Sequence, residues 1–217
     1  MTKLLLTSIA ALFLATGTAH AANITWEWNE NIQSPIIFIR GKLVDEDVTT
    51  FKSALGEIAE GSGTANKRIW VDLISPGGAI SAGLNIGGLI AYYGMGTVVA
   101  ADKSQCLSAC GLIWLAGNPR AVANGALVGF HAAWRGKGEV SSDGNALVGA
   151  YLNHLGFDYR AIRYFTQAAP DSIEILTEDK AAAIGLKAIF YKSHKIDTSS
   201  HTPETYCPSG QVTEPCR

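Results

Sequence analysis

The sequence has 217 residues, with 17 Lys and Arg against 19 Asp and Glu and a formal net charge of −2. This balance argues against a broad DNA- or RNA-binding surface, because such surfaces gather positive charge. Hydrophobic residues make up 47% of the chain and charged residues 17%, which is typical of a folded core and unlike a disordered chain. The length suits one domain.

The first 21 residues have the features of a secretory signal peptide. Lys3 supplies a positive charge, residues 4–15 form an apolar run, and Ala19-His20-Ala21 is a small-x-small cleavage site. We therefore expect cleavage after Ala21 and a periplasmic or secreted protein with no membrane span after cleavage. The alternative is an uncleaved N-terminal anchor, but the apolar run is shorter than the about 20 residues that a spanning helix needs.

The following apolar residues alternate between strand-like runs and helical spacing. Val48, Phe51, Leu55 and Ile58 recur at steps of three and four, which indicates an amphipathic helix. In chain order the first half predicts a strand at 36–39, this helix, a strand at 69–74, a turn at 75–78, a helix rich in small residues at 79–93 and a strand at 97–101. This order is typical of an α/β fold with a largely parallel sheet.

The second half continues the pattern. It predicts a buried helix at 107–115, short strands at 121–123 and 126–130, helices after Ser141, a short helix from Thr177 to Gly185 and a last strand at 188–191. From Ser193 onward the chain is polar. We therefore expect a single α/β domain over residues 22–195 and a polar C-terminal tail over residues 196–217.

All four cysteines follow the predicted signal peptide: Cys106, Cys110, Cys207 and Cys216. Four cysteines allow three pairings. We favour Cys106 with Cys110, because residues one helical turn apart lie about 6 Å from each other, near the upper end of disulfide reach. Cys207 with Cys216 would then close a small loop in the tail. Four free thiols are the alternative, which an oxidising compartment disfavours.

Three places carry residues suited to catalysis. The glycines of Ser75-Pro76-Gly77-Gly78 can expose backbone N–H groups to an oxyanion or phosphate. Ser108, at the start of the buried helix, has the positive end of the helix dipole beneath it. His131 follows a short apolar strand and could act as a general base. The structural alternatives are an ordinary strand-to-helix turn, a helix N-cap and a buried histidine.

Redox or metal chemistry at Cys106 and Cys110 is a further alternative. Their spacing is C-x₃-C, however, and not the C-x-x-C of thioredoxin-like sites. A zinc site would also need more ligands than this pair, and no second cysteine pair lies nearby in the sequence. We expect neither a metal nor a cofactor.

The order and spacing of these segments resemble the ClpP/crotonase superfamily, in particular the proteolytic subunit of the Clp protease and its secreted relatives, which also place cysteines around the serine. The matching positions are the turn at 75–78, Ser108, Ala116-Gly117 and His131, and the similarity covers residues 36–186. The resemblance implies a ClpP/crotonase-like ββα superhelix. It also implies that Ser108 is the nucleophile and His131 the general base.

By the same resemblance, the backbone N–H groups of Gly78 and Ala109 form the oxyanion hole. The third catalytic residue would be an acid ahead of a Leu-Ser/Thr helix start, which here is Leu176-Thr177. Asp171 is the nearest upstream aspartate and our candidate for that acid. Asp158 is the first alternative and Glu174 the second. Strict counting puts Ile173 at the position of the acid, so the register is off by a couple of residues.

The resemblance implies a serine hydrolase, most simply a peptidase that cleaves peptides or proteins through an acyl-enzyme. An exported protein meets neither ATP nor a cytoplasmic ATPase ring, so we expect ATP-independent activity without an ATPase partner. We also expect a homo-oligomer, because the relatives stack into rings and Ala82, Gly83 and Gly87 form a small-residue helix face. The alternative is a catalytically inactive ClpP-like binding or oligomerisation module.

Overall fold

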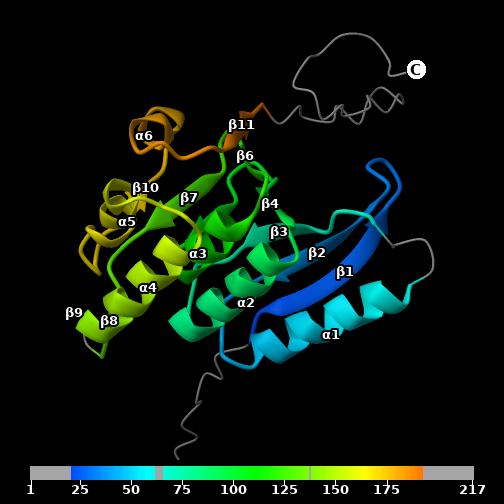
Figure 1. Cartoon of the computed structure of the whole chain (residues 1–217), viewed down its shortest axis with the longest axis horizontal. Coiled ribbons are helices and arrows are strands. Elements are labelled where there is room, and N and C mark those ends of the chain that lie inside the picture. The colour runs from blue at the N-terminus through cyan, green and yellow to red at the C-terminus, as the bar shows by residue number, and fades with distance from the viewer. Residues whose placement is uncertain (1–20, 62–65, 137, 193–217) are drawn as a thin grey trace, which may run out of the picture.

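The computed structural model describes residues 21–61, 66–136 and 138–192, which form a single mixed α/β domain (Figure 1). The predicted signal peptide up to His20, the tail at 196–217 and the predicted pair of Cys207 with Cys216 lie outside the described residues. Within the described part, no helix combines the length and the apolar character that crossing a bilayer requires.

The larger of the two main sheets has the strand order β1-β2-β3-β4-β6-β11. β1 is antiparallel to β2, and every later pair is parallel. Its strands are β1 (Asn23–Asn29), β2 (Ser34–Arg40), β3 (Trp70–Ile74), β4 (Gly96–Val99), β6 (Arg120–Ala123) and β11 (Ile189–Tyr191). The predicted α/β class with a largely parallel sheet is therefore confirmed.

A smaller sheet has the order β10-β7-β5, with β5 parallel and β10 antiparallel to β7. A separate hairpin pairs β8 with β9. The strands are β5 (Gln105–Leu107), β7 (Leu127–Phe130), β8 (Trp134–Arg135), β9 (Glu139–Val140) and β10 (Glu174–Ile175). The sequence pattern predicts only β7 among these, because strands of two or three residues are too short to show a period.

The helices are α1 (Asp47–Glu60), α2 (Ile80–Tyr92), α3 (Ala109–Ala116), α4 (Ser142–His154), α5 (Tyr159–Thr166) and α6 (Glu178–Ala183). α1 and α2 lie side by side against one face of the larger sheet (Figure 1). α1 buries Phe51, Ala54 and Ile58, which confirms the helical spacing seen in the sequence. The predicted buried helix at 107–115 is α3, but Leu107 still belongs to β5 and the helix begins at Ala109.

All eight residues of α3 are buried, and polar contacts fix the helix between strands. The indole N–H of Trp114 donates to the carbonyl of Ala121 in β6 at 2.9 Å. The hydroxyl of Thr97 in β4 donates to the carbonyl of Trp114 at 2.7 Å. These contacts satisfy the polar groups that α3 takes out of water. They anchor the C-terminal half of α3, the helix that begins next to Ser108.

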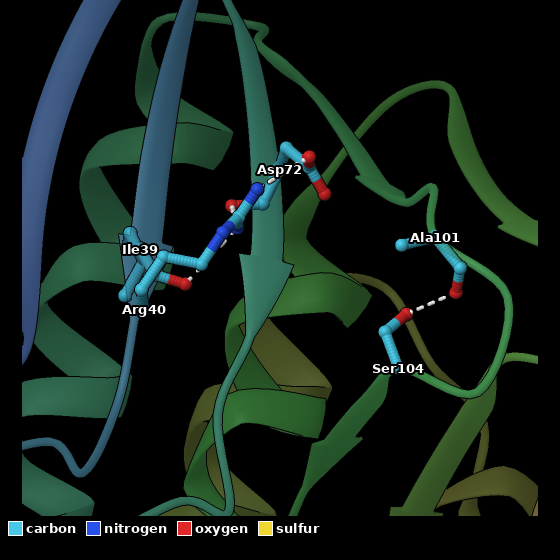
Figure 2. A network of polar contacts seen from close by, with 5 residues as sticks. All are labelled: Ile39, Arg40, Asp72, Ala101 and Ser104. Carbon is cyan, nitrogen blue, oxygen red and sulfur yellow. Dashed lines mark hydrogen bonds and ion pairs between the residues drawn. The ribbon is translucent and has the colours of Figure 1, made fainter.

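Two further contacts hold the strands that lead to the candidate site. The guanidinium of Arg40 in β2 donates to the carboxylate of Asp72 in β3 at 2.6 Å and to its backbone carbonyl at 2.7 Å (Figure 2). Figure 2 also shows the hydroxyl of Ser104 bonded to the carbonyl of Ala101, in the loop that enters β5. The first contact joins neighbouring parallel strands, and the second shapes the approach to Ser108.

The small residues of α2 serve packing within the protomer. Ala82, Gly83 and Gly87 are all buried. A Cβ on Gly83 would lie 2.9 Å from the backbone oxygen of Ala109, and a Cβ on Gly87 would overlap the ring of Tyr151. We interpret the small-residue face as what lets α2 approach α3 and α4. This face therefore gives no support to the predicted self-association.

We predict opposite effects for two alanine substitutions in α2. Gly88→Ala meets nothing within 4 Å and should stabilise the protein by about 0.5–1 kcal/mol through helix propensity. Gly83→Ala should destabilise it by about 1–3 kcal/mol, because the new Cβ presses on the backbone of Ala109. Urea denaturation measures both. Equal effects from the two substitutions would contradict the close contact of α2 with α3.

Candidate active site

The three segments singled out in the sequence each follow the carboxyl end of a strand. Ser75 follows β3, Ser108 follows β5 and His131 follows β7. β5 is parallel to β7, and an isolated parallel bridge joins Ser75 to Cys106 of β5. Because the carboxyl ends of parallel strands meet at one edge, the three segments lie together although they are far apart in the chain.

Backbone hydrogen bonds connect these segments to each other. The N–H of Ser75 donates to Gln105 at 2.8 Å, and the N–H of Leu107 donates back to the carbonyl of Ser75 at 3.0 Å. On the other side, the N–H of Ser108 donates to the carbonyl of Gly129 at 2.8 Å. Ser108 is therefore held between the Gly-Gly turn and the strand that ends before His131.

Ser108 has a backbone conformation that side chains rarely adopt. Its φ is 57° and its ψ is −122°, a left-handed φ that is unfavourable for residues other than glycine. It occupies the N-cap position of α3, yet its side chain makes no cap hydrogen bond. The hydroxyl is therefore not used as a helix cap, and the sharp strand-to-helix turn matches the geometry that exposes a nucleophilic serine.

A disulfide closes the turn that carries Ser108. Cys106 and Cys110 are bonded, with their Cα atoms 5.1 Å apart, so the favoured local pairing is confirmed. The bond joins β5 to α3 across Ser108 and ties both sides of the turn. Because both sulfurs are in the bond, neither is free to ligate a metal. Among the described residues, no three His, Cys, Asp or Glu side chains gather as a metal site would require.

The Gly-Gly turn approaches Ser108 closely. Gly77 has a φ of 94°, and a Cβ on it would lie 2.8 Å from the Cβ of Ser108 and 3.1 Å from the nitrogen of Ala109. Only glycine fits this approach. Gly78 has a φ of 149° and pairs in parallel with Leu43. The Gly-Gly sequence is therefore required by geometry at both positions.

Two backbone donors beside Ser108 have no acceptor within the part of the chain that the structure describes. The pairing with Leu43 uses the carbonyl of Gly77 and the N–H of Ala79, which leaves the N–H of Gly78 without a partner among the described residues. The N–H of Ala109 begins α3, and the first N–H groups of a helix have no partner inside the helix. Both residues line the same cleft as Ser108. Their placement is what an oxyanion hole needs.

His131 is half-buried and lines this cleft. Its Nδ1 lies 2.7 Å from the carbonyl oxygen of Ala132. Because a carbonyl oxygen can only accept, this contact requires the proton on Nδ1 and leaves Nε2 as a proton acceptor. No hydrogen bond joins the Ser108 hydroxyl to the imidazole among the contacts of the described residues; catalytic contacts are often long in proteins without substrate.

The three candidate acids differ in their surroundings. Asp158 caps α5, where the backbone N–H of Ala161 and the side chain of Arg160 hold its pKa below the ordinary value. Glu174 forms an ion pair with Lys180 at 2.6 Å. Asp171 is exposed and has no hydrogen bond or ion pair within the described part of the chain. Among the described residues, no hydrogen bond or ion pair joins any of the three to His131.

The strand pairing next to His131 is short. β10 pairs with β7 so that Glu174 lies opposite Phe130 and Ile175 opposite Gly129. The ladder ends at Phe130, and beyond it the N–H of Ala132 donates to the carbonyl of Ala168 at 2.8 Å. The position that counting along the sequence gives to the acid is held by Ile173, directly before Glu174 of β10.

The cleft has a volume of about 490 Å³. Its apolar wall includes Leu112, Phe130, Val148 and Phe165, and its charged lining residues are Lys42 and Arg135. The analysis of the sequence missed both cations. Lys42 lies two residues after the end of β2 and Arg135 lies in the two-residue strand β8, so neither belongs to a motif that would have marked it.

No protein-family model matches the chain, and no curated protein matches it by sequence. Several solved structures, in contrast, are similar to this chain in fold. The 1510-N membrane-bound stomatin-specific protease, as a mutant in complex with a substrate peptide, is 20% identical with a TM-score of 0.53, covering 74% of each chain. The 1510-N membrane protease specific for a stomatin homolog, from Pyrococcus horikoshii, is 20% identical with a TM-score of 0.51, covering 70% of each chain.

A mutant of ClpP1 from Listeria monocytogenes is 18% identical with a TM-score of 0.53, and the match covers 71% of this chain and 90% of that chain. These similarities show that the chain has the ClpP/crotonase-like fold, as the motifs implied. The sequence identity between this chain and these solved structures is low, at 18–20%.

The left-handed φ of Ser108 gives a testable stability difference. Ser108→Gly and Ser108→Ala both remove the hydroxyl, but only glycine relieves the backbone strain. We predict that the glycine variant is more stable than the alanine variant by about 1 kcal/mol, measured by guanidinium denaturation. Equal stability of the two variants would show that the turn relaxes in solution.

Proposed function

We propose that this chain, which has the ClpP/crotonase-like fold, is an exported, ATP-independent serine hydrolase, and specifically a peptidase with Ser108 as its nucleophile. One observation carries the proposal. Ser108, whose hydroxyl is not used as a cap, lines one cleft with an imidazole and with two backbone N–H groups that have no acceptor among the described residues. A turn with a purely structural role does not need a free hydroxyl, two N–H donors and an imidazole in one cleft, whereas acyl transfer needs all of these groups.

The mechanism follows from the roles of these groups. Nε2 of His131 takes the proton of Ser108 as its oxygen attacks the substrate carbonyl carbon. The carbonyl π electrons move to oxygen, and the N–H groups of Gly78 and Ala109 stabilise the resulting negative charge together with the start of α3. The protonated imidazole then gives its proton to the leaving amine as the C–N bond breaks. Water, deprotonated by His131, hydrolyses the acyl-enzyme.

The orientation of His131 is the unusual part of this site. The carbonyl of Ala132 fixes the tautomer, but a carbonyl dipole stabilises an imidazolium less than a carboxylate does. Where an aspartate orients the histidine of a serine protease, losing it lowers kcat by about 10⁴. We therefore propose a Ser-His pair of low intrinsic activity. If a third residue does act, Asp171 is the acid to test, because Asp158 and Glu174 are engaged elsewhere.

The substrate class follows from the cleft. Its apolar wall and its volume suit an amino-acid side chain, and one protease of similar fold has been solved in complex with a substrate peptide. We propose peptides or loose segments of proteins as substrates. The charged lining residues Lys42 and Arg135 favour acidic over basic residues near the cleaved bond.

Labelling with a fluorophosphonate tests the nucleophile directly. We predict that the reagent modifies Ser108, that Ser108→Ala abolishes labelling, and that His131→Gln slows it by about 10²-fold or more because the general base is lost. Mass spectrometry locates the modified residue. A folded wild-type protein that no fluorophosphonate labels at Ser108 would contradict the proposal.

The same assay decides the role of the acid. We expect Asp171→Asn to label within about twofold of the control Asp179→Asn, an exposed carboxylate in α6, because the Ala132 carbonyl already orients His131. A tenfold or larger loss that is confined to Asp171→Asn would instead establish Asp171 as the third catalytic residue.

Export rests on the signal-peptide features and is also a proposal. We expect the protein recovered from outside the cytoplasm of its host to begin at Ala22, as read by N-terminal sequencing. A cell-associated protein that retains residues 1–21 would instead support the uncleaved anchor.

The second candidate function is a non-catalytic binding or oligomerisation module with this fold. The observation that favours it is the absence of any carboxylate against His131 among the described residues. The fluorophosphonate assay separates the two candidate functions.

We also propose that the protein self-associates. This proposal rests on the family resemblance alone, and a monomeric mass by light scattering would contradict it.

A further inference from the structure

Asp47 is a carboxylate that the fold buries without a cationic partner. Its side chain belongs to the first residue of α1, and the residue is 1% exposed. Oδ2 accepts from the backbone N–H of Val44 at 2.8 Å and from that of Ala22 at 3.4 Å. No Lys, Arg or His of the described residues forms an ion pair with it.

Such a burial is unfavourable unless positive charge compensates it. Removing a carboxylate from water carries a penalty of several kcal/mol that hydrogen bonds alone only partly offset. The start of α1 supplies a partial positive charge. None of the described side chains adds a full positive charge through an ion pair with Asp47.

The backbone nitrogen of Ala22 is where that charge can arise. Ala22 is 8% exposed, while Ala21 before it is exposed. Ala22 is also the first residue after the predicted cleavage site. Hydrolysis of the bond between Ala21 and Ala22 adds water across it: the new carboxylate leaves with Ala21, and the new amine on Ala22 takes up a proton near neutral pH. The neutral N–H that now faces Asp47 becomes an ammonium.

We propose that Asp47 is a built-in binding site for the α-ammonium group of Ala22, formed when the signal peptide is removed. The inference rests on the cleavage position in the proposed export. A charge-assisted hydrogen bond is shorter and stronger than one from a neutral amide. Processing therefore converts an uncompensated buried carboxylate into an ion pair.

This ion pair connects to the active site through one loop. Asp47 holds the N–H of Val44, and the neighbouring Leu43 donates to the carbonyl of Gly77 at 2.8 Å. Leu43 also accepts from the N–H of Ala79 at 2.9 Å. The loop that Asp47 anchors therefore supports the Gly77-Gly78 turn and its oxyanion-hole donor. Signal-peptide removal consequently stabilises the part of the fold that shapes the site.

The test uses a full chain in which residues 17–21 are replaced by the recognition sequence of a protease that cuts before Ala22. The same preparation, before and after the cut, differs by one peptide bond. We expect the cut to raise Tm by about 4 °C or more in the wild type. In Asp47→Asn the rise should fall to about 1 °C or less, because the amide cannot pair with an ammonium.

Glu46→Gln is the matched control. It removes a negative charge one residue away, at a side chain that makes no cap hydrogen bond, and it should keep the full wild-type rise. The proposal is overturned by a wild type whose Tm the cut leaves unchanged. It is equally overturned by an Asp47→Asn variant with the wild-type rise.

A second measurement covers the case in which Asp47→Asn does not fold. In the cut wild-type protein, an amine-specific ester should acylate the α-amine of Ala22 several times more slowly than it does in the same protein unfolded in urea. Equal rates in the two states would overturn the proposal. Neither measurement needs hydrolase activity, so a protein without a reactive Ser108 still tests the ion pair.

Discussion

The left-handed turn at Ser108 is the constraint on which the rest of the candidate site depends. A serine at φ 57° persists only where its surroundings hold it. Here the holding groups are the disulfide from Cys106 to Cys110 and the hydrogen bond from Ser108 to Gly129. The turn matters for the chemistry of the site, because the hydroxyl makes no cap hydrogen bond with its own helix. Within the described part of the chain, the N–H of Ala109 has no acceptor either and can meet an incoming oxygen.

The architecture supplies the other groups by a simple rule. Three parallel strand ends lie side by side, so the turn after β3, the serine after β5 and the histidine after β7 meet without any local sequence contact. Gly77 lets the first of these approach the second, as no larger residue would fit. The loop from Leu43 to Asp47 then supports the Gly-Gly turn from behind. Site geometry and fold are thus set by the same backbone hydrogen bonds.

The sequence predicted what periodicity and turn chemistry can encode. The α1 spacing, the buried α3, the Gly-Gly turn and the pairing of Cys106 with Cys110 all follow from local patterns, and the structure bears them out. Strands β8, β9 and β10 are too short for a pattern, so the hairpin with Arg135 and the pairing of β10 with β7 were out of reach. The Ala132 carbonyl beside His131 was missed for another reason: backbone acceptors carry no sequence signal. The small residues of α2 were assigned to self-association, although α3 and α4 occupy that face.

In the proposed site, an oxygen bound next to Ser108 is held by two backbone amides and faced by one imidazole. A crystal structure of the protein after reaction with a fluorophosphonate would show whether these groups converge. We expect a phosphonyl group on Oγ of Ser108, with its free oxygen about 2.7–3.1 Å from the nitrogens of both Gly78 and Ala109 and with Nε2 of His131 on the same side. An adduct on another residue, or a phosphonyl oxygen directed into solvent away from both amides, would rule out this arrangement.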